Sequence, residues 1–180
     1  MTLDEIRAAS SNVFPVERLA GCKTAACFFA SLYNGRQDAI HLFDAGVEQC
    51  VLVDADHEKL VTMARPYMRE RPRWTFIAAD AFRYAKFLAS VRESRDVVTA
   101  DPPSQLIPDV LREFRLWQSI AEKVLVLGCS AEWLDGNEAT PEGVDARLEA
   151  VLGPGLPRCV EVRKRSDFNG GQFWAVWEPR

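Results

Sequence analysis

The stretch Asp96-Val97-Val98-Thr99-Ala100-Asp101-Pro102-Pro103 decides the fold class of this chain. It begins as an almost continuous apolar run, which is typical of strands in a parallel sheet that helices cover on both faces. The run stops at an aspartate and two prolines, and proline has no N–H to donate to a sheet ladder. We therefore expect a buried strand over 96–100 that ends in a stiff turn.

Similar runs and helical segments alternate on both sides of this stretch. The other apolar runs are residues 24–30, 50–55, 75–79 and 123–129. Between them the apolar residues have helical spacing, and the residue types predict N-caps at Thr2, Asp56, Asp80 and Thr140. One helix is expected over 104–120, and Pro66 is expected to kink or shorten the helix after Asp56. Alternating strands and helices indicate an α/β protein with a parallel sheet.

The C-terminal part has a different pattern. Two strand-like runs, 158–164 and 173–178, are joined by a segment that contains Asn169-Gly170-Gly171. Because these residues accept positive φ angles, they predict an antiparallel hairpin. We expect one domain over 1–180, with an N-terminal helix and lead-in at 1–21 and a core at 22–180.

Composition excludes several classes of protein. Apolar residues make up 48% of the 180 residues and charged residues 27%, as in globular chains. The sequence shows neither a signal peptide nor an apolar run long enough to span a membrane. Five cysteines without a C-x-x-C pair indicate a reducing compartment, so we expect a cytoplasmic protein. Two histidines without ligand spacing predict no metal site, and a net charge of −4 gives no general attraction to nucleic acid.

Three of the predicted strands end in an aspartate: Asp54, Asp80 and Asp101. In open α/β sheets, ligands bind beyond the carboxyl ends of the strands, and an acid after the second strand accepts hydrogen bonds from ribose hydroxyls. The alternative is that each aspartate only caps the following helix. Both interpretations remain open for each residue taken alone.

Over residues 22–178 this arrangement resembles the class I S-adenosylmethionine-dependent methyltransferases, a Rossmann-like fold with a mostly parallel seven-stranded sheet that ends in an antiparallel hairpin. The resemblance implies that S-adenosylmethionine is the cofactor. It assigns Asp54 to the ribose, and Asp80 with the backbone of Ala81 to the adenine. It places the turn that contains Ala30, Ser31, Asn34 and Gly35 near the methionine end.

Asp101-Pro102-Pro103 is similar to the D-P-P motif of methyltransferases that act on nucleobase amino groups, among them small ribosomal-RNA guanine-N2 methylases. The likeness implies that Asp101 and the Pro102 carbonyl accept the N–H bonds of the amine, while Pro103 helps to stiffen the loop. The implied function is methyl transfer to an amino group of RNA or DNA. A chain of this length leaves little room for target recognition, so a partner chain is a further expectation.

Two departures from the family pattern support an alternative function. Cys27 stands where the family has an acid, and Ser31 is among the residues that replace glycines in the first turn. Ser104 stands where base-amine methylases carry an aromatic ring. The alternative is a catalytically inactive, methyltransferase-like binding or scaffold subunit. A nicotinamide dehydrogenase is a third possibility, which the absence of G-x-G-x-x-G and the terminal hairpin both disfavour.

The remaining polar motifs have simpler interpretations. Arg69-Glu70-Arg71-Pro72-Arg73 and Arg163-Lys164-Arg165 are basic clusters that we expect on the solvated surface, although phosphate contact is an alternative. Cys129, after the fifth strand, is expected to be a buried structural thiol rather than a nucleophile.

Overall fold

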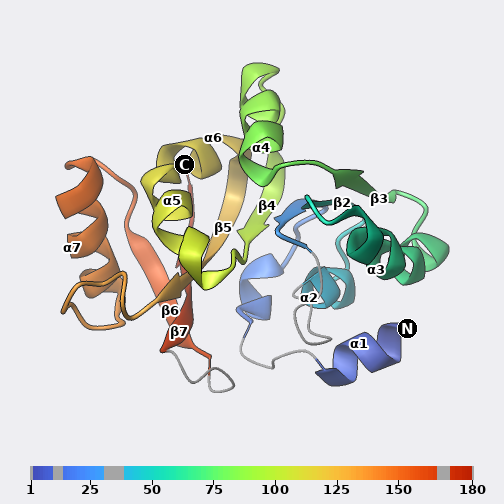
Figure 1. Ribbon diagram of the computed structural model, residues 1–180, viewed down its shortest axis with the longest axis horizontal. Coiled ribbons are helices and arrows are strands. Elements are labelled where there is room, and N and C mark those ends of the chain that lie inside the picture. Colours follow the sequence, from blue (N-terminus) through green and yellow to red (C-terminus); the bar gives the residue numbers. More distant parts are fainter. Residues whose placement is uncertain (1, 10–13, 31–38, 166–170, 180) are drawn as a thin grey trace.

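A computed structural model describes residues 2–9, 14–30, 39–165 and 171–179 (Figure 1). Its centre is a seven-stranded sheet with the order β3-β2-β1-β4-β5-β7-β6. The strands are β1 (Thr24–Phe28), β2 (Gln49–Asp54), β3 (Trp74–Ala78), β4 (Arg95–Ala100), β5 (Ala121–Ser130), β6 (Cys159–Lys164) and β7 (Gln172–Trp177). Strands β1 to β5 are parallel, and β7 is antiparallel to both β5 and β6. The predicted fold class and terminal hairpin are confirmed.

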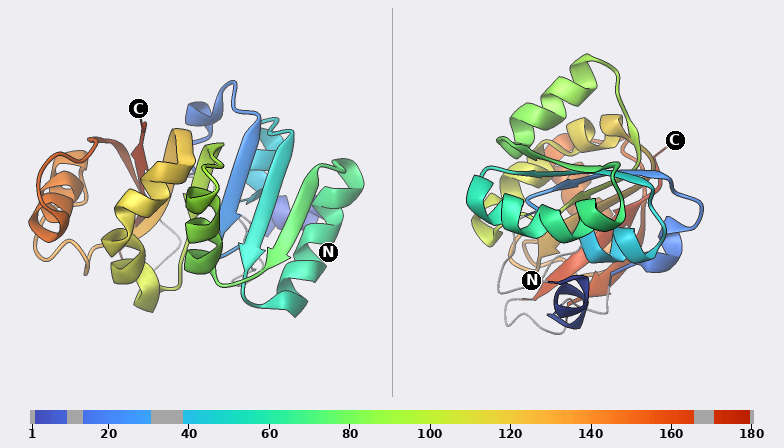
Figure 2. Two further views of the ribbon diagram at one scale, coloured as in Figure 1. Left: turned by 90° about the horizontal axis from the view of Figure 1, so that it is seen from above. Right: turned by 90° about the vertical axis from the view of Figure 1, so that its right-hand side faces the viewer.

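Helices cover both faces of the sheet (Figure 2). One face packs against α1 (Leu3–Ala9), the short helix η1 (Val16–Leu19), α2 (Ala39–Asp44) and α3 (His57–Glu70). The other packs against α4 (Ala81–Ser90), α5 (Ile107–Arg112), α6 (Phe114–Ile120) and α7 (Pro141–Leu152). Strand β1 shows why its residues are nearly all apolar: Ala26 and Phe28 join one core, while Ala25 and Cys27 join the other.

Most helix ends lie where the residue types predict them. Thr2 and Glu5 exchange hydrogen bonds as a capping box, and the side chain of Thr140 caps α7. Helix α3 runs through Pro66 to Glu70, so the expected shortening is wrong, and the alternative of a kink at Pro66 stays a prediction. The helix expected over 104–120 is also wrong as a single element, because the short helix η2 (Ser104–Leu106), α5 and α6 replace it, with a break at Glu113.

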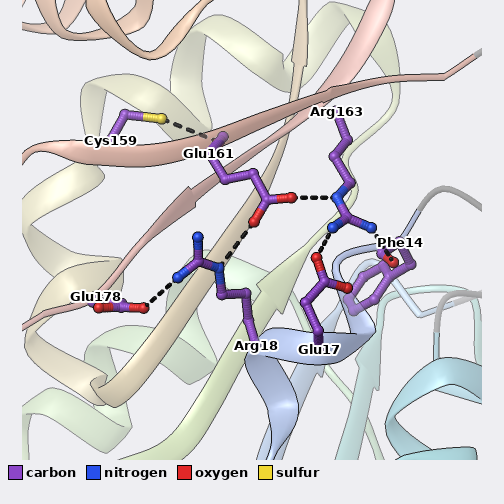
Figure 3. Close-up of polar contacts among 7 residues, drawn as sticks. All are labelled: Phe14, Glu17, Arg18, Cys159, Glu161, Arg163 and Glu178. Atoms are coloured by element: carbon purple, nitrogen blue, oxygen red, sulfur yellow. Dashed lines mark hydrogen bonds and ion pairs between the residues drawn. The ribbon is translucent and has the colours of Figure 1, made fainter.

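An ion network fastens the N-terminal part of the chain to the hairpin (Figure 3). Glu161 of β6 accepts hydrogen bonds from Arg18 of η1 and from Arg163 on its own strand. Arg163 also pairs with Glu17 and donates to the backbone carbonyl of Phe14. Several charged partners therefore hold η1 against β6, the strand that leads to Arg165.

Candidate functional site

The carboxyl ends of β2, β3 and β4 lie at one edge of the sheet, as parallel pairing requires. Asp54 is the last residue of β2, Asp80 follows β3, and Asp101 follows β4. The three aspartates share this edge, but their hydrogen-bond partners differ. These partners show which of the three aspartates caps a helix.

Asp54 does not cap the helix that follows it. That cap is Asp56, whose side chain accepts the backbone N–H of Lys59 at 3.1 Å. Asp54 instead accepts the backbone N–H of Asp56 through Oδ1, at 2.8 Å, and its side chain is half-buried. The loop therefore fixes the orientation of Asp54 without using it as a cap, so capping does not explain an acid here.

Asp80 is an exposed N-cap of α4. Its Oδ1 atom accepts the backbone N–H of Arg83 at 2.9 Å. Ala81 is the buried first residue of the helix, and the ring of Phe82 packs edge-to-face on Phe29, with ring centroids 6.1 Å apart. The structural interpretation of Asp80 is thus confirmed, and its role toward adenine stays a prediction.

Asp101 forms an ion pair that the sequence did not reveal. One guanidinium nitrogen of Arg165, Nη1, donates to Oδ1 at 2.8 Å and to Oδ2 at 2.9 Å. The Arg165 side chain is only 4% exposed, whereas that of Asp101 is 31% exposed. The guanidinium also lies over the ring of Trp174, 4.6 Å from the ring centroid. The acid of the Asp-Pro-Pro turn is therefore held from the side of the hairpin.

The turn after Asp101 has a second tie to the hairpin. Gln172, at the start of β7, donates from Nε2 to the Ser104 hydroxyl at 2.9 Å. Pro102 is buried, and the exposed Pro103 accepts the backbone N–H of Leu106 through its carbonyl oxygen. The turn is fixed at both ends, as the prolines predict, and Pro103 uses its carbonyl to start η2.

Strand β1 leads into a turn with unusual backbone geometry. Phe29 has φ +57°, a left-handed conformation that residues other than glycine rarely adopt. Ala30 is buried, and its N–H donates to the Val53 carbonyl at 3.1 Å. Ser31, Asn34 and Gly35, predicted to lie near the cofactor, are outside the described residues.

A cavity of about 270 Å³ opens beside the Asp-Pro-Pro turn. Its lining residues are Ser104, Pro108, Arg112, Ser130, Glu132, Trp133, Arg147 and Val151. Trp133 is buried, and the guanidinium of Arg147 lies over its ring, 5.9 Å from the ring centroid. No sequence signal marks Trp133 as a cavity residue, because its spacing resembles that of any core residue.

The basic cluster 163–165 is not simply a solvated surface, and for Arg165 that prediction is wrong. Its partner lies 64 residues away in sequence, so spacing alone could not pair the two residues. The one available signal was position, since the cluster lies at the end of a strand that reaches the carboxyl edge. The cluster 69–73 joins the end of α3 to the start of β3, at the opposite edge of the sheet.

Other chemistries find little support in the described part of the chain. Burial raises the pKa of the Cys129 thiol well above its ordinary value, and the charges of Cys159 and Asp101 act in the same direction. A thiol in this setting is inert as a nucleophile. Among the described residues, no cluster of His, Cys, Asp or Glu could hold a metal ion. None of the helices described is both long enough and apolar enough to cross a membrane.

The chain is similar to several solved structures. It matches a Streptococcus mutans protein assigned as a SAM-dependent methyltransferase with a TM-score of 0.66 and 14% identity, over 91% of this chain and 46% of the other. It matches the Methanococcus jannaschii fibrillarin pre-rRNA processing protein with a TM-score of 0.61 and 16% identity, over 99% and 75%. Aeropyrum pernix fibrillarin, with natively bound S-adenosyl-L-methionine, gives 0.58 and 16%, over 97% and 73%.

The chain has the fold of the S-adenosylmethionine-dependent methyltransferases. It spans less than half the length of the Streptococcus mutans structure. No family model and no curated protein sequence matches it. At these identities the similarity establishes the methyltransferase fold and leaves cofactor, substrate and activity to be argued from the site.

Proposed function

We propose that this protein is an S-adenosylmethionine-dependent methyltransferase that acts on an amino group of a nucleobase in RNA or DNA. The observation that carries the proposal is the position of Asp54. It lies at the carboxyl end of β2, half-buried and held by its own loop, while the neighbouring Asp56 does the capping. A carboxylate in this place is suited to accept hydrogen bonds from the two hydroxyls of a ribose.

The described residues at this edge fit the cofactor. Asp54 would hold the ribose, and Asp80 with the first turn of α4 would hold the adenine, because the exposed Asp80 uses one oxygen for its cap. When bound, S-adenosylmethionine supplies a methyl group that its sulfonium already activates. The protein's own task is then to position the acceptor.

Asp101 and the Pro102 carbonyl are the groups that would orient the acceptor nitrogen. An exocyclic base amine is a poor nucleophile because its lone pair is delocalised into the ring, and two hydrogen-bond acceptors favour its pyramidal form. The fixed turn supports this role, since Leu106 and Gln172 bond to Pro103 and Ser104 and limit its movement. Ser104, the residue after Pro103, also lines the adjoining cavity of about 270 Å³, where part of the substrate would lie.

Calorimetry with S-adenosylmethionine and S-adenosylhomocysteine tests cofactor binding. We expect Asp54→Asn to weaken binding by roughly 10- to 100-fold, because it removes about 1.5–3 kcal/mol of charged hydrogen bonding. The matched control is Glu58→Gln, an exposed acid of the first turn of α3, which should bind like the wild type. No heat from the wild type up to millimolar ligand rejects the proposal.

Transfer of a tritiated methyl group from S-adenosylmethionine tests the reaction. Ribosomal RNA transcribed in vitro and unmethylated DNA serve as probes, and mass spectrometry of the nucleosides locates the methyl group. A methyl group on an exocyclic base amine supports the proposal, and methylation at ring carbons or ribose oxygens contradicts the assignment of the acceptor.

A second candidate function is an inactive methyltransferase-like scaffold. The observation in its favour is that Arg165 bonds to both oxygens of Asp101, the acid that an active enzyme would turn toward its acceptor. This function requires no cofactor affinity and a folded Asp54→Ala variant that keeps its cellular role. Loss of that role in the folded variant excludes it.

A further inference from the structure

The ion pair between Asp101 and Arg165 depends on the strand order of the sheet and on a glycine in β5. Asp101 follows β4, while Arg165 comes directly after β6, and the two strands are separated in the sheet by β5 and β7. Gly128 of β5 leaves the necessary room, because a Cβ atom there would lie 2.6 Å from Oδ1 of Asp101. Gly128 and the buried guanidinium of Arg165 therefore both lie against the Asp101 carboxylate, and the ring of Trp174 packs on that guanidinium.

Arg165 determines how much of that carboxylate remains for a ligand. Two ionised oxygens offer about four lone-pair positions, and Nη1 of Arg165 occupies one on each oxygen. The Asp101 side chain is 31% exposed, so part of it remains accessible to a ligand. The guanidinium is permanently charged, and the pair as a whole is neutral.

From this we infer that Arg165 is a positioning residue, which fixes Asp101 and cancels its charge so that the site selects a neutral N–H donor of the aromatic-amine type. A lone carboxylate would attract a protonated aliphatic amine by its charge. A neutral pair offers hydrogen-bond acceptors without that attraction. The inference rests on the proposed methyl transfer and adds Arg165 to the residues that determine its acceptor.

The variant Arg165→Gln tests the positioning role. We expect the rate of methyl transfer to unmodified ribosomal RNA to fall at least tenfold in kcat, while the dissociation constant for S-adenosylmethionine stays within twofold. Arg165→Lys should recover part of the rate, because a single nitrogen makes both contacts to Asp101. The matched control is Arg163→Gln, which removes an ion-paired arginine from β6 without contact to Asp101 and should leave kcat unchanged.

The double variant Asp101→Asn/Arg165→Gln distinguishes a loss of stability from a loss of the positioning role. It removes both charges, so it should unfold at a higher urea concentration than Arg165→Gln alone. Additive losses of stability, or an unchanged kcat in folded Arg165→Gln, overturn the positioning role.

Substrate class is tested on the wild type with a lysine-rich peptide beside the RNA. We expect transfer to the RNA only, and transfer to the lysine amines overturns the inferred class while leaving methyl transfer itself intact. If the wild type binds no S-adenosylmethionine, the proposed function fails, and the role of Arg165 in transfer fails with it.

Discussion

Strand β4 has an aspartate near each end, and the two residues are used differently. Asp96, at the amino edge, accepts the backbone N–H groups of Lys23 at 2.6 Å and Thr24 at 3.1 Å, and it pairs with Lys123 at 2.8 Å. Its side chain is 11% exposed. Asp101, at the carboxyl edge, is more exposed and is held by one side chain from the hairpin.

The difference shows how a structural carboxylate can be told from a functional one. Asp96 accepts hydrogen bonds from two backbone N–H groups at the start of β1. Backbone N–H groups need a hydrogen-bond partner in any folded chain, so this role of Asp96 is structural. Asp101 bonds to no backbone group among the interactions described for it. Its side chain is 31% exposed, and it follows β4 at the edge where ligands bind in such sheets. The amino edge stabilises the fold, and the carboxyl edge carries the proposed site.

The largest effect expected from this comparison is on stability at the amino edge. Asp96→Ala leaves the N–H groups of Lys23 and Thr24 without their acceptor, and it should lower the free energy of unfolding by about 3 kcal/mol. Urea unfolding followed by circular dichroism measures the loss. Binding of S-adenosylmethionine to the folded fraction should be unchanged, and weakened binding would contradict the division between the two edges.

Gly128→Ala should disturb the carboxyl edge instead. The added Cβ would lie 2.6 Å from Oδ1 of Asp101 and 3.4 Å from its Cα, so the carboxylate must shift from Arg165. We expect a loss of about 2 kcal/mol, as for an overpacked core position. In an Asp101→Ala background the same change should cost clearly less, because the clashing oxygen is gone. Equal costs in both backgrounds would show that Asp101 is not the contact that matters.

Unfolding measured over a range of pH should show how much the negative charge of Asp96 contributes to the free energy of unfolding, apart from the size and shape of its side chain. Burial by itself raises the pKa of Asp96, but hydrogen bonds from Lys123 and from the backbone of Lys23 and Thr24 outweigh it and leave the pKa below its ordinary value. A lowered folded-state pKa contributes stability above the unfolded pKa of about 4, and this stability is lost as the pH falls through the folded value.

Asp96→Asn should therefore cost about 1.5 kcal/mol near pH 7, the difference between charged and neutral hydrogen bonds. Its stability should approach that of the wild type as the pH falls below about 4. Unfolding of both proteins between neutral pH and acid measures the gap. A gap that stays constant would mean that the charge of Asp96 contributes nothing.

Features that depend on residues close in sequence could be predicted from the sequence, and features that depend on distant residues could not. Apolar runs and caps such as Asp56 and Asp80 depend on residues close in sequence, so strands, helix starts and the hairpin were predictable. Arg165 depends on a partner 64 residues away and on the space left by Gly128, and no local pattern encodes either. The break between α5 and α6 at Glu113 was not predictable either, because the apolar spacing continues across it.

The smallest expected effect concerns Phe29, the residue after β1. Its positive φ costs about 1–2 kcal/mol relative to glycine, while its ring packs on Phe82. Phe29→Ala removes the ring but keeps the strain, whereas Phe29→Gly removes both, so Phe29→Gly should be more stable than Phe29→Ala by about 1 kcal/mol. Paired urea unfolding curves measure the difference.

The same pair of variants bears on function, because Phe29 directly precedes Ala30, where the turn proposed for the methionine end of the cofactor begins. If the left-handed backbone of Phe29 shapes that turn, Phe29→Gly should bind S-adenosylmethionine at least as tightly as Phe29→Ala, since glycine adopts this conformation without strain. Weaker binding by Phe29→Gly would mean that a residue with a side chain is needed to hold the turn. The backbone strain at Phe29 would then be a feature of the proposed site at the carboxyl edge, just as the backbone N–H groups bonded to Asp96 are a feature of the amino edge.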